Sequence, residues 1–284
     1  MDRFESLEFE SHADANRIPP GAGREQPRAQ PKDGPSFARA GADMREAGFF
    51  GSAADFYSKA LGFNDQDYAS WVGLVDSLVR AGEIARADAE SQEAIGNYGQ
   101  VRPLYAVRAL VLAHQARFEE ADPLLQVALE AREPAWYALC VAGELVLRRE
   151  PGAHAEAERY FQEAVDQAGW EWEAAYLGGW AMLEAETAVL AASYFAEAAH
   201  MNPKAAAAWL GLADAFYALR LHDQACFYYD RVLELEPSHN EVRARRQSAG
   251  LKVYGLMTPF KLGSLRRRWQ REYARVMNGA RWRK

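Results

Sequence analysis

The sequence has no run of 18 or more apolar residues, the length that a membrane-spanning helix requires. It has only two cysteines, Cys140 and Cys226, and no C-x-x-C pair, so neither a disulfide framework nor a cysteine-based metal site is expected. Both cysteines fall on apolar faces of predicted helices, which favours buried free thiols. The first residues, MDRFESLEFESH, are acidic and lack the apolar core of a signal peptide. We therefore expect a cytoplasmic protein.

Signatures of catalysis and of cofactor binding are also missing. The histidines form no H-x3-H or H-E-x-x-H pair that would suit a metal. The chain contains no G-x-x-x-x-G-K-[ST], no G-x-G-x-x-G and no G-x-S-x-G. Gly178 and Gly179 fit close packing between helices better than a ligand loop. We expect a protein that is not an enzyme and that uses no metal and no cofactor.

Charge is distributed unevenly along the chain. From Gly250 onward, ten Lys or Arg and a single acid, Glu272, give a charge of +9. Because the whole chain has a net charge of −7, the part before Gly250 has −16. An acidic body and a basic C-terminal part should meet different partners, or each other.

A unit of about 34 residues recurs through most of the chain. The clearest copy spans residues 206–238 and consists of two halves. The characteristic residues of the first half are Trp209, Leu212, Ala213 and Phe216, and those of the second half are Ala225, Tyr229, Val232 and Pro237. This spacing resembles the tetratricopeptide repeat (TPR), which is a helix-turn-helix unit. The resemblance implies an all-α, right-handed α-solenoid of about six repeats, predicted at 34–67, 68–101, 102–135, 136–171, 172–205 and 206–239.

Three of these repeats depart from the pattern. In the second repeat, Ser91 stands where an aromatic residue is expected. In the third, Arg108 stands where an apolar residue is expected. The fourth fits only if two extra residues lie in the turn around Pro151 and Gly152.

The two ends of the chain differ from the repeat array at 34–249. Residues 1–33 are rich in proline and charge and are predicted to be disordered, with a short acidic-aromatic docking motif at Phe4, Leu7 and Phe9. Residues 239–248 predict a charged capping helix that stops at Gly250. The apolar stretch 251–263 is interrupted by glycine and proline, which predicts an extended connector.

The basic extension 250–284 contains a predicted amphipathic helix that begins at Ser264. Its candidate contact residues are Arg266, Arg267, Arg268, Trp269, Arg271, Tyr273 and Arg275. Such a helix suits an anionic membrane surface, nucleic acid or an acidic protein surface. We favour protein contact, including self-association, because the acidic body would repel phosphate.

In TPR proteins, the first helix of each repeat lines a concave groove that holds a partner segment. Carried over by register, this implies a groove whose second half is aromatic and acidic. The candidate groove residues are Tyr137, Glu144, Glu173, Tyr176, Trp180, Glu184, Asp214 and Tyr217. Such a surface favours a basic or amphipathic segment with apolar anchors. The alternative is that the aromatic side chains pack between helices and the acids are solvated surface.

The resemblance also disfavours one kind of ligand. TPR proteins that hold the acidic C-termini of chaperones bind the carboxylate with a clamp of Lys and Asn at the first positions of the groove. In this sequence, Ala38 and Ala42 stand at those positions. The sequence therefore predicts a non-catalytic scaffold or adaptor that binds a protein segment in its groove, as a subunit of a larger assembly. Two alternatives stay open. One is a secretion or assembly chaperone for a hydrophobic client, and the other is a nucleic-acid or membrane tether that acts through the tail.

Overall fold

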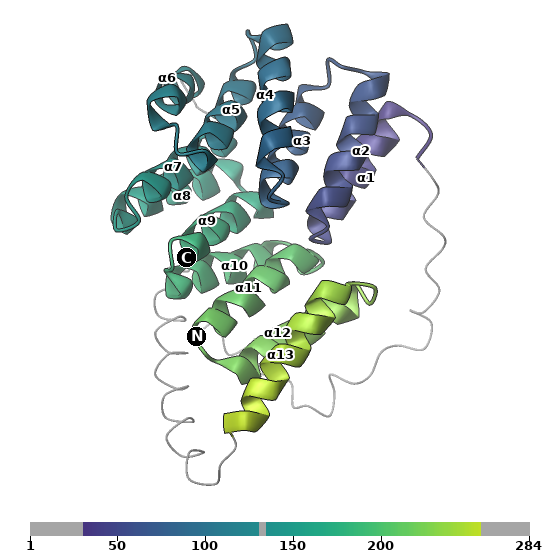
Figure 1. Cartoon of the computed structure of the whole chain (residues 1–284), viewed down its shortest axis with the longest axis vertical. Coiled ribbons are helices and arrows are strands. Elements are labelled where there is room, and N and C mark those ends of the chain that lie inside the picture. Colours follow the sequence, from purple (N-terminus) through teal and green to yellow (C-terminus); the bar gives the residue numbers. More distant parts are fainter. Residues whose placement is uncertain (1–30, 131–134, 257–284) are drawn as a thin grey trace. The chain divides into compact units, whose positions relative to one another are not determined.

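The structure is a computed structural model that describes residues 31–130 and 135–256. These residues form thirteen α-helices and no strand, so the predicted all-α solenoid is confirmed (Figure 1). The helices are α1 (Gly34–Glu46), α2 (Phe50–Phe63), α3 (Tyr68–Arg80), α4 (Ile84–Tyr98), α5 (Arg102–His114), α6 (Phe118–Leu129), α7 (Trp136–Arg149), α8 (His154–Ala168), α9 (Trp172–Glu184), α10 (Ala188–Met201), α11 (Ala206–Ala218), α12 (His222–Leu235) and α13 (Asn240–Leu256). The predicted docking motif at Phe4, Leu7 and Phe9 and the predicted tail helix from Ser264 lie outside the described residues.

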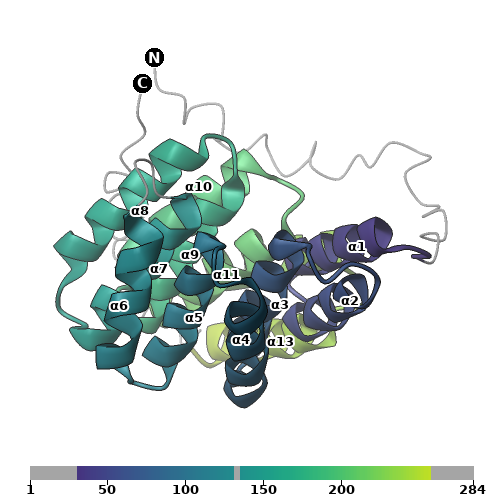
Figure 2. The same cartoon turned by 90° about the horizontal axis from the view of Figure 1, so that it is seen from above.

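Helices α1 to α12 pair into six hairpins, each of which packs on the next (Figures 1 and 2). The odd-numbered helix of each hairpin begins at Gly34, Tyr68, Arg102, Trp136, Trp172 or Ala206. Since each hairpin leaves one apolar face uncovered, the next hairpin buries that face, and a continuous core runs through the stack.

An aromatic residue on the second helix of a hairpin is held between two glycines. For Phe195 of α10, a Cβ atom on Gly179 would lie 2.8 Å from the ring, and one on Gly211 of the next hairpin would lie 2.4 Å from it. Glycine is therefore required at both positions. Tyr57 lies in the same way between Gly41 and Gly73, and Phe161 between Gly143 and Gly178. The prediction that Gly178 and Gly179 serve close helix packing is thus confirmed.

The departures in the second and third repeats compensate one another. Arg108 is buried, at 8% exposure, and its Nη1 donates to Ser91 Oγ at 3.0 Å. The same nitrogen donates to the carbonyl oxygen of Asp88 at 2.9 Å and to its carboxylate at 2.5 Å. A small residue at position 91 leaves room for the arginine, and Asp88 balances its charge.

In five of the six hairpins, the turn contains one left-handed residue. It is glycine in the first two hairpins, at Gly48 and Gly82, with φ of 85° and 78°. In three later hairpins the same place is taken by Ala116, Glu186 and Arg220, with φ of 59°, 60° and 61°. These side chains adopt a backbone conformation that costs about 1–2 kcal/mol per residue relative to the right-handed region.

The last helix differs from the prediction. Helix α13 runs through Gly250 to Leu256, so the predicted stop at Gly250 and the predicted extended backbone at 251–256 were wrong. The physical reason is burial, because Val242 and Ala249 are fully covered in the packing of α13 on α12. This packing outweighs the roughly 1 kcal/mol that a glycine costs inside a helix.

Within residues 31–130 and 135–256, no helix has both the length and the apolar character needed to cross a membrane. Both cysteines are free thiols, as predicted, although only Cys140 is fully buried and Cys226 is half-buried. Burial raises the pKa of the Cys140 thiol, which keeps it protonated and unreactive.

Candidate functional site

The first helices of the hairpins converge so closely that their inner faces contact one another. Helix α3 contacts α1 and α5, and α7 contacts α5 and α9. Residues about 60 positions apart therefore meet: the Tyr137 hydroxyl donates to Asp76 Oδ1 at 3.2 Å, and Arg80 Nη2 donates to Glu144 Oε2 at 2.8 Å. The inner face of the described array is occupied by its own side chains.

A chain of alternating charges crosses this inner face from α1 to α9. Arg45 lies 3.2 Å from Asp76, which lies 3.4 Å from Arg80, and Arg80 lies 2.8 Å from Glu144. Arg148 continues the chain, because it pairs with Glu144 at 3.2 Å and also with Glu184. We refer to this set as the inner charge chain: Arg45, Asp76, Arg80, Glu144, Arg148 and Glu184. Each member has a neighbour of opposite sign, which is the condition under which buried charges are tolerated.

Glu144 is the point where three cationic or polar groups meet. Besides Arg80 and Arg148, His114 Nε2 is hydrogen-bonded to Glu144 Oε1 at 2.8 Å. Burial alone would raise the pKa of Glu144. The charges of Arg80, His114 and Arg148 and the hydrogen bond from His114 outweigh burial and hold the pKa well below its usual value. Glu144 is therefore an anion whose partners all lie within the protein.

Aromatic residues of α9 are covered by the first hairpin. The ring of Phe50 lies 6.3 Å from that of Tyr176 and 6.0 Å from that of Trp180. Trp180 also receives the guanidinium of Arg80 at 5.6 Å from the ring centroid, a cation–π contact. The first hairpin thus lies against two of the predicted groove residues.

The first hairpin also contacts the fifth hairpin and the loop between α12 and α13. Phe49 stacks on His239 with ring centroids 4.4 Å apart, and Asn202 Nδ2 donates to Glu46 Oε1 at 3.1 Å. Arg45 adds an ion pair with Glu173 at 3.3 Å. These contacts join residues more than 120 positions apart, so they depend on how far the stack curves and not on local sequence.

The eight predicted groove residues fall into two groups. Tyr137, Glu144 and Tyr176 are buried, at 7%, 2% and 3% exposure, and they take part in the internal contacts above. The other five keep part of their surface in solvent: Glu173, Trp180, Glu184, Asp214 and Tyr217. Two of these lie apart from the inner charge chain, on α11.

Helix α13 engages that pair on α11. Asp214 accepts a hydrogen bond from the Tyr229 hydroxyl at 2.5 Å and pairs with Arg245 of α13. Burial raises the pKa of Asp214, and Arg245 and Tyr229 offset only part of that effect. Tyr217 is hydrogen-bonded to Lys252, whose ammonium lies 4.2 Å from the ring centroid. The four carboxylates of the predicted acidic groove are thus paired with arginines of the same chain, although the groove prediction assigns them to a partner or to solvent.

Open space remains at the edge of the array where the hairpin turns lie. A hollow of about 290 Å³ lies between the ends of α5, α7 and α9, and we call it the first edge hollow. Its walls combine apolar groups with the exposed end of the inner charge chain. The residues that line it include Phe118, Leu147, Pro151, Ala181, His114, Arg148 and Glu184. A second hollow lies beside Leu183 and the turn that follows α9.

One grouping at the first edge hollow has the donor types of a metal site. His114, Glu144 and Glu184 offer ligand atoms that lie within 4.8 Å of one another. The carboxylates are already paired with Arg80 and Arg148, so a divalent cation would meet two guanidinium charges and displace Arg148. We therefore assign no metal to this group. No spacing in the sequence indicates this group, because its members come from three different repeats.

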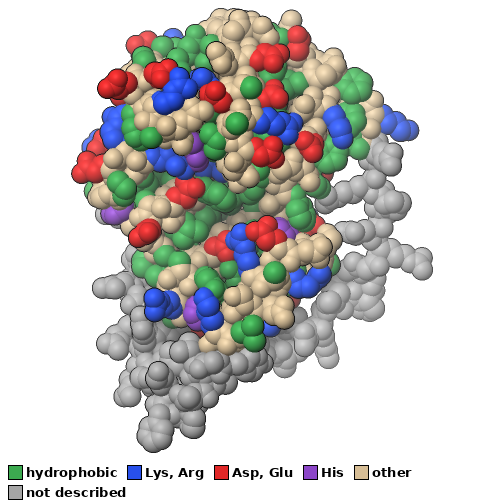
Figure 3. Space-filling view, in the orientation of Figure 1, with side chains coloured by type: hydrophobic (Ala, Val, Ile, Leu, Met, Phe, Trp, Pro, Cys, Tyr) green, Lys and Arg blue, Asp and Glu red, His purple; other side chains and the backbone are tan. Residues whose placement is uncertain are grey.

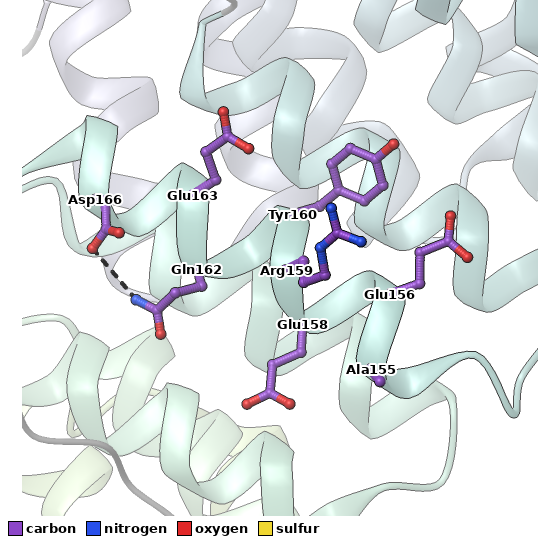
Figure 4. Close-up of a pocket in the computed structure, with 8 residues that line it drawn as sticks. All are labelled: Ala155, Glu156, Glu158, Arg159, Tyr160, Gln162, Glu163 and Asp166. Atoms are coloured by element: carbon purple, nitrogen blue, oxygen red, sulfur yellow. Dashed lines mark hydrogen bonds between the residues drawn. The ribbon is translucent and has the colours of Figure 1, made fainter.

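The outer surface of the described residues is charged but mixed. Acidic and basic side chains are interspersed over the face shown in Figure 3. A depression of about 550 Å³ lies along α8, and Figure 4 shows the side chains that line it. All the residues that line it come from this one helix, and Gln162 Nε2 donates within it to Asp166 at 3.5 Å. It is a solvated helix face and we assign it no ligand.

No protein-family model and no curated protein matches the sequence. The fold is similar to a tetratricopeptide repeat protein from Parabacteroides merdae, with 14% identity, a TM-score of 0.49, and coverage of 78% of this chain and 86% of the other. It is also similar to TTC0263, a TPR protein of Thermus thermophilus, with 17% identity, a TM-score of 0.45, and coverage of 77% and 99%. For Pseudomonas aeruginosa pilF the identity is 20%, the TM-score 0.43 and the coverage 73% and 98%. All three identities are at most 20% and all three TM-scores are below 0.5. The helices and their packing show that the described part of the chain is an all-α solenoid of TPR-like hairpins.

Proposed function

We propose that this protein is a non-catalytic scaffold that binds a segment of a protein partner at the first edge hollow. The observation behind the proposal is that internal ion pairs occupy the inner face, whereas this hollow stays open beside the end of the inner charge chain. Stacked hairpins offer extended surfaces of this kind, which repeat proteins use for binding.

The lining of the hollow suggests the chemistry of the partner. Phe118, Pro151 and Ala185 line it, and all three keep part of their surface free for apolar contact with an anchoring side chain. Glu184 is 42% exposed and pairs only with Arg148 among the ion pairs of the described residues, so it can also meet a basic group of the partner. A segment with an apolar anchor next to Arg or Lys fits both features.

A chaperone for a hydrophobic client is less well supported. Such a protein needs a broad apolar surface to shield its client, whereas the inner face of the described hairpins is filled by charged pairs and by Phe50. We therefore favour recognition of a short segment over shielding of a long one.

The test is affinity purification of the tagged full-length chain from its native host, followed by mass spectrometry. Glu184→Lys reverses the charge at the hollow, and Glu163→Lys makes the same change on the outer face of α8 as a control. We expect the partner to be captured by the wild type and by Glu163→Lys, and to be lost with Glu184→Lys. Equal capture by all three chains, with unchanged thermal unfolding, would place the partner site elsewhere.

A further inference from the structure

A second edge hollow, of about 520 Å³, lies beside the turn between α9 and α10 and the end of α11. Four half-buried apolar side chains form much of its wall: Leu183, Val189, Leu190 and Leu219. Glu186, which is exposed, stands at its rim. A hollow with these walls gains free energy when an apolar side chain enters it.

Helix α13 contacts α11 one residue away from the wall of this hollow. Lys252 of α13 contacts Tyr217, and Tyr217 directly precedes Ala218, which lines the hollow. Helix α13 ends at Leu256, about one helical turn after Lys252. An extended segment of seven residues spans up to about 24 Å, which sets the reach of residues 257–263 from the end of α13.

The composition of that segment matches the hollow. Residues 257–263 read MTPFKLG, in which Met257, Phe260 and Leu262 are apolar and Lys261 is basic. A phenylalanine ring is a large apolar group with few rotamers to lose on burial. Lys261 follows Phe260 directly, where it can meet the Glu186 carboxylate at the rim.

From the hollow, the exit point of the chain and this composition, we propose that residues 257–263 of the same chain pack into the second edge hollow, with Phe260 as the anchor. Tethering strengthens the case, since a short linker holds a segment near its site at an effective concentration in the millimolar range. The arginine-rich stretch that begins at Arg266 then starts from this edge of the array. The proposal is independent of the partner site at the first edge hollow.

The experiment uses the full-length chain with p-benzoylphenylalanine in place of Phe260. After irradiation at low micromolar concentration, the monomer is isolated and its cross-linked peptides are identified by mass spectrometry. We expect cross-links within one chain to residues 183–190 or 218–219. The same photoreactive residue in place of Phe63, which is 62% exposed on α2, is the control and should give none at these positions.

Two further measurements make the test decisive. Leu190→Glu places a charge in the hollow and should abolish the cross-link. Because that variant could also disturb the fold, hydrogen exchange of the wild type is compared with that of Phe260→Asp, and faster exchange is expected at the α9–α10 and α11–α12 turns alone. Cross-links that appear only in a dimer, that map elsewhere or that are absent, or exchange that is unchanged, would overturn the proposal.

Discussion

Glu144→Gln should lower the free energy of unfolding by about 3 kcal/mol, although it changes only one oxygen to nitrogen. Removing one partner of a buried ion pair costs about 3–5 kcal/mol, because the other charge stays buried without its counter-ion. In this protein the Arg80 side chain is 1% exposed and faces Glu144 at 2.8 Å. Asp76, at 3.4 Å, still balances part of the charge of Arg80, which places the expected loss at the lower end of that range.

The measurement is chemical and thermal unfolding of the full-length chain. A loss of about 3 kcal/mol corresponds to a fall in melting temperature of roughly 6–12 °C for a domain of this size. Glu234→Gln is the matched control, because its ion pair with Arg231 has side chains that are 64% and 42% exposed. The control should cost less than about 1 kcal/mol.

A double variant separates the loss of a pair from the loss of packing. Arg80→Met combined with Glu144→Met removes both charges and should be clearly more stable than the sum of the two single variants predicts. If Glu144→Gln costs no more than Glu234→Gln, or if the two methionine substitutions are additive, the inner charge chain does not act as a coupled buried network.

The same carboxylate sets a dependence on pH. The pKa of Glu144 is lowered in the folded protein, so folding favours its ionised form. Its contribution is fully present above the unfolded pKa, near 4.5, and is lost as the pH falls through the folded value. In acid, the difference in stability between the wild type and Glu144→Gln should therefore shrink, as unfolding at a series of pH values can measure.

Three further outcomes are expected from other parts of the structure. Gly211→Ala should cost roughly 1–3 kcal/mol in thermal unfolding, since its Cβ would lie 2.4 Å from the Phe195 ring; a neutral effect would mean that the ring can shift freely. Ala116→Gly should stabilise by about 0.5–1 kcal/mol because φ is 59° there, and destabilisation would contradict strain at this turn. His239 is buried against Phe49, and its Nε2 has no hydrogen-bond partner among the described residues. Burial lowers its pKa; Glu241 opposes this effect and Arg245 adds to it. The contribution of His239 to the free energy of unfolding should therefore fall as the pH drops below about 6.5. His239→Phe should lose less stability between pH 7 and pH 5 than the wild type loses, and the loss that remains is due to other groups. An unchanged pH profile would show that His239 is not the group responsible.

The sequence predicted the local elements of this protein well, for a physical reason. Helix periodicity, small residues at close approaches and turn residues act over a few positions, so the pattern around Trp209, Ala213 and Tyr229 is enough to indicate a hairpin. Six copies in register then indicate a stack, because no single hairpin can bury its open face. The same local logic misplaced the end of α13, where burial of Ala249 against α12 outweighs the tendency of Gly250 to end a helix.

The site depended on distances that no local pattern encodes. The sequence located Glu144, Trp180 and Glu184 on inner helices, but it could not show that Arg80 and Arg148 would reach them from other repeats. The partnership of Ser91 and Arg108 was equally hidden, since each looked like an isolated departure.

Small rotations between successive hairpins add up along the stack, and their sum brings Phe49 to His239 and Arg45 to Glu173. The repeated hairpin and its stacking therefore follow from local patterns in the sequence. Which inner surface is filled and which edge stays open depends on the accumulated curvature of the whole array, and only the three-dimensional arrangement shows it.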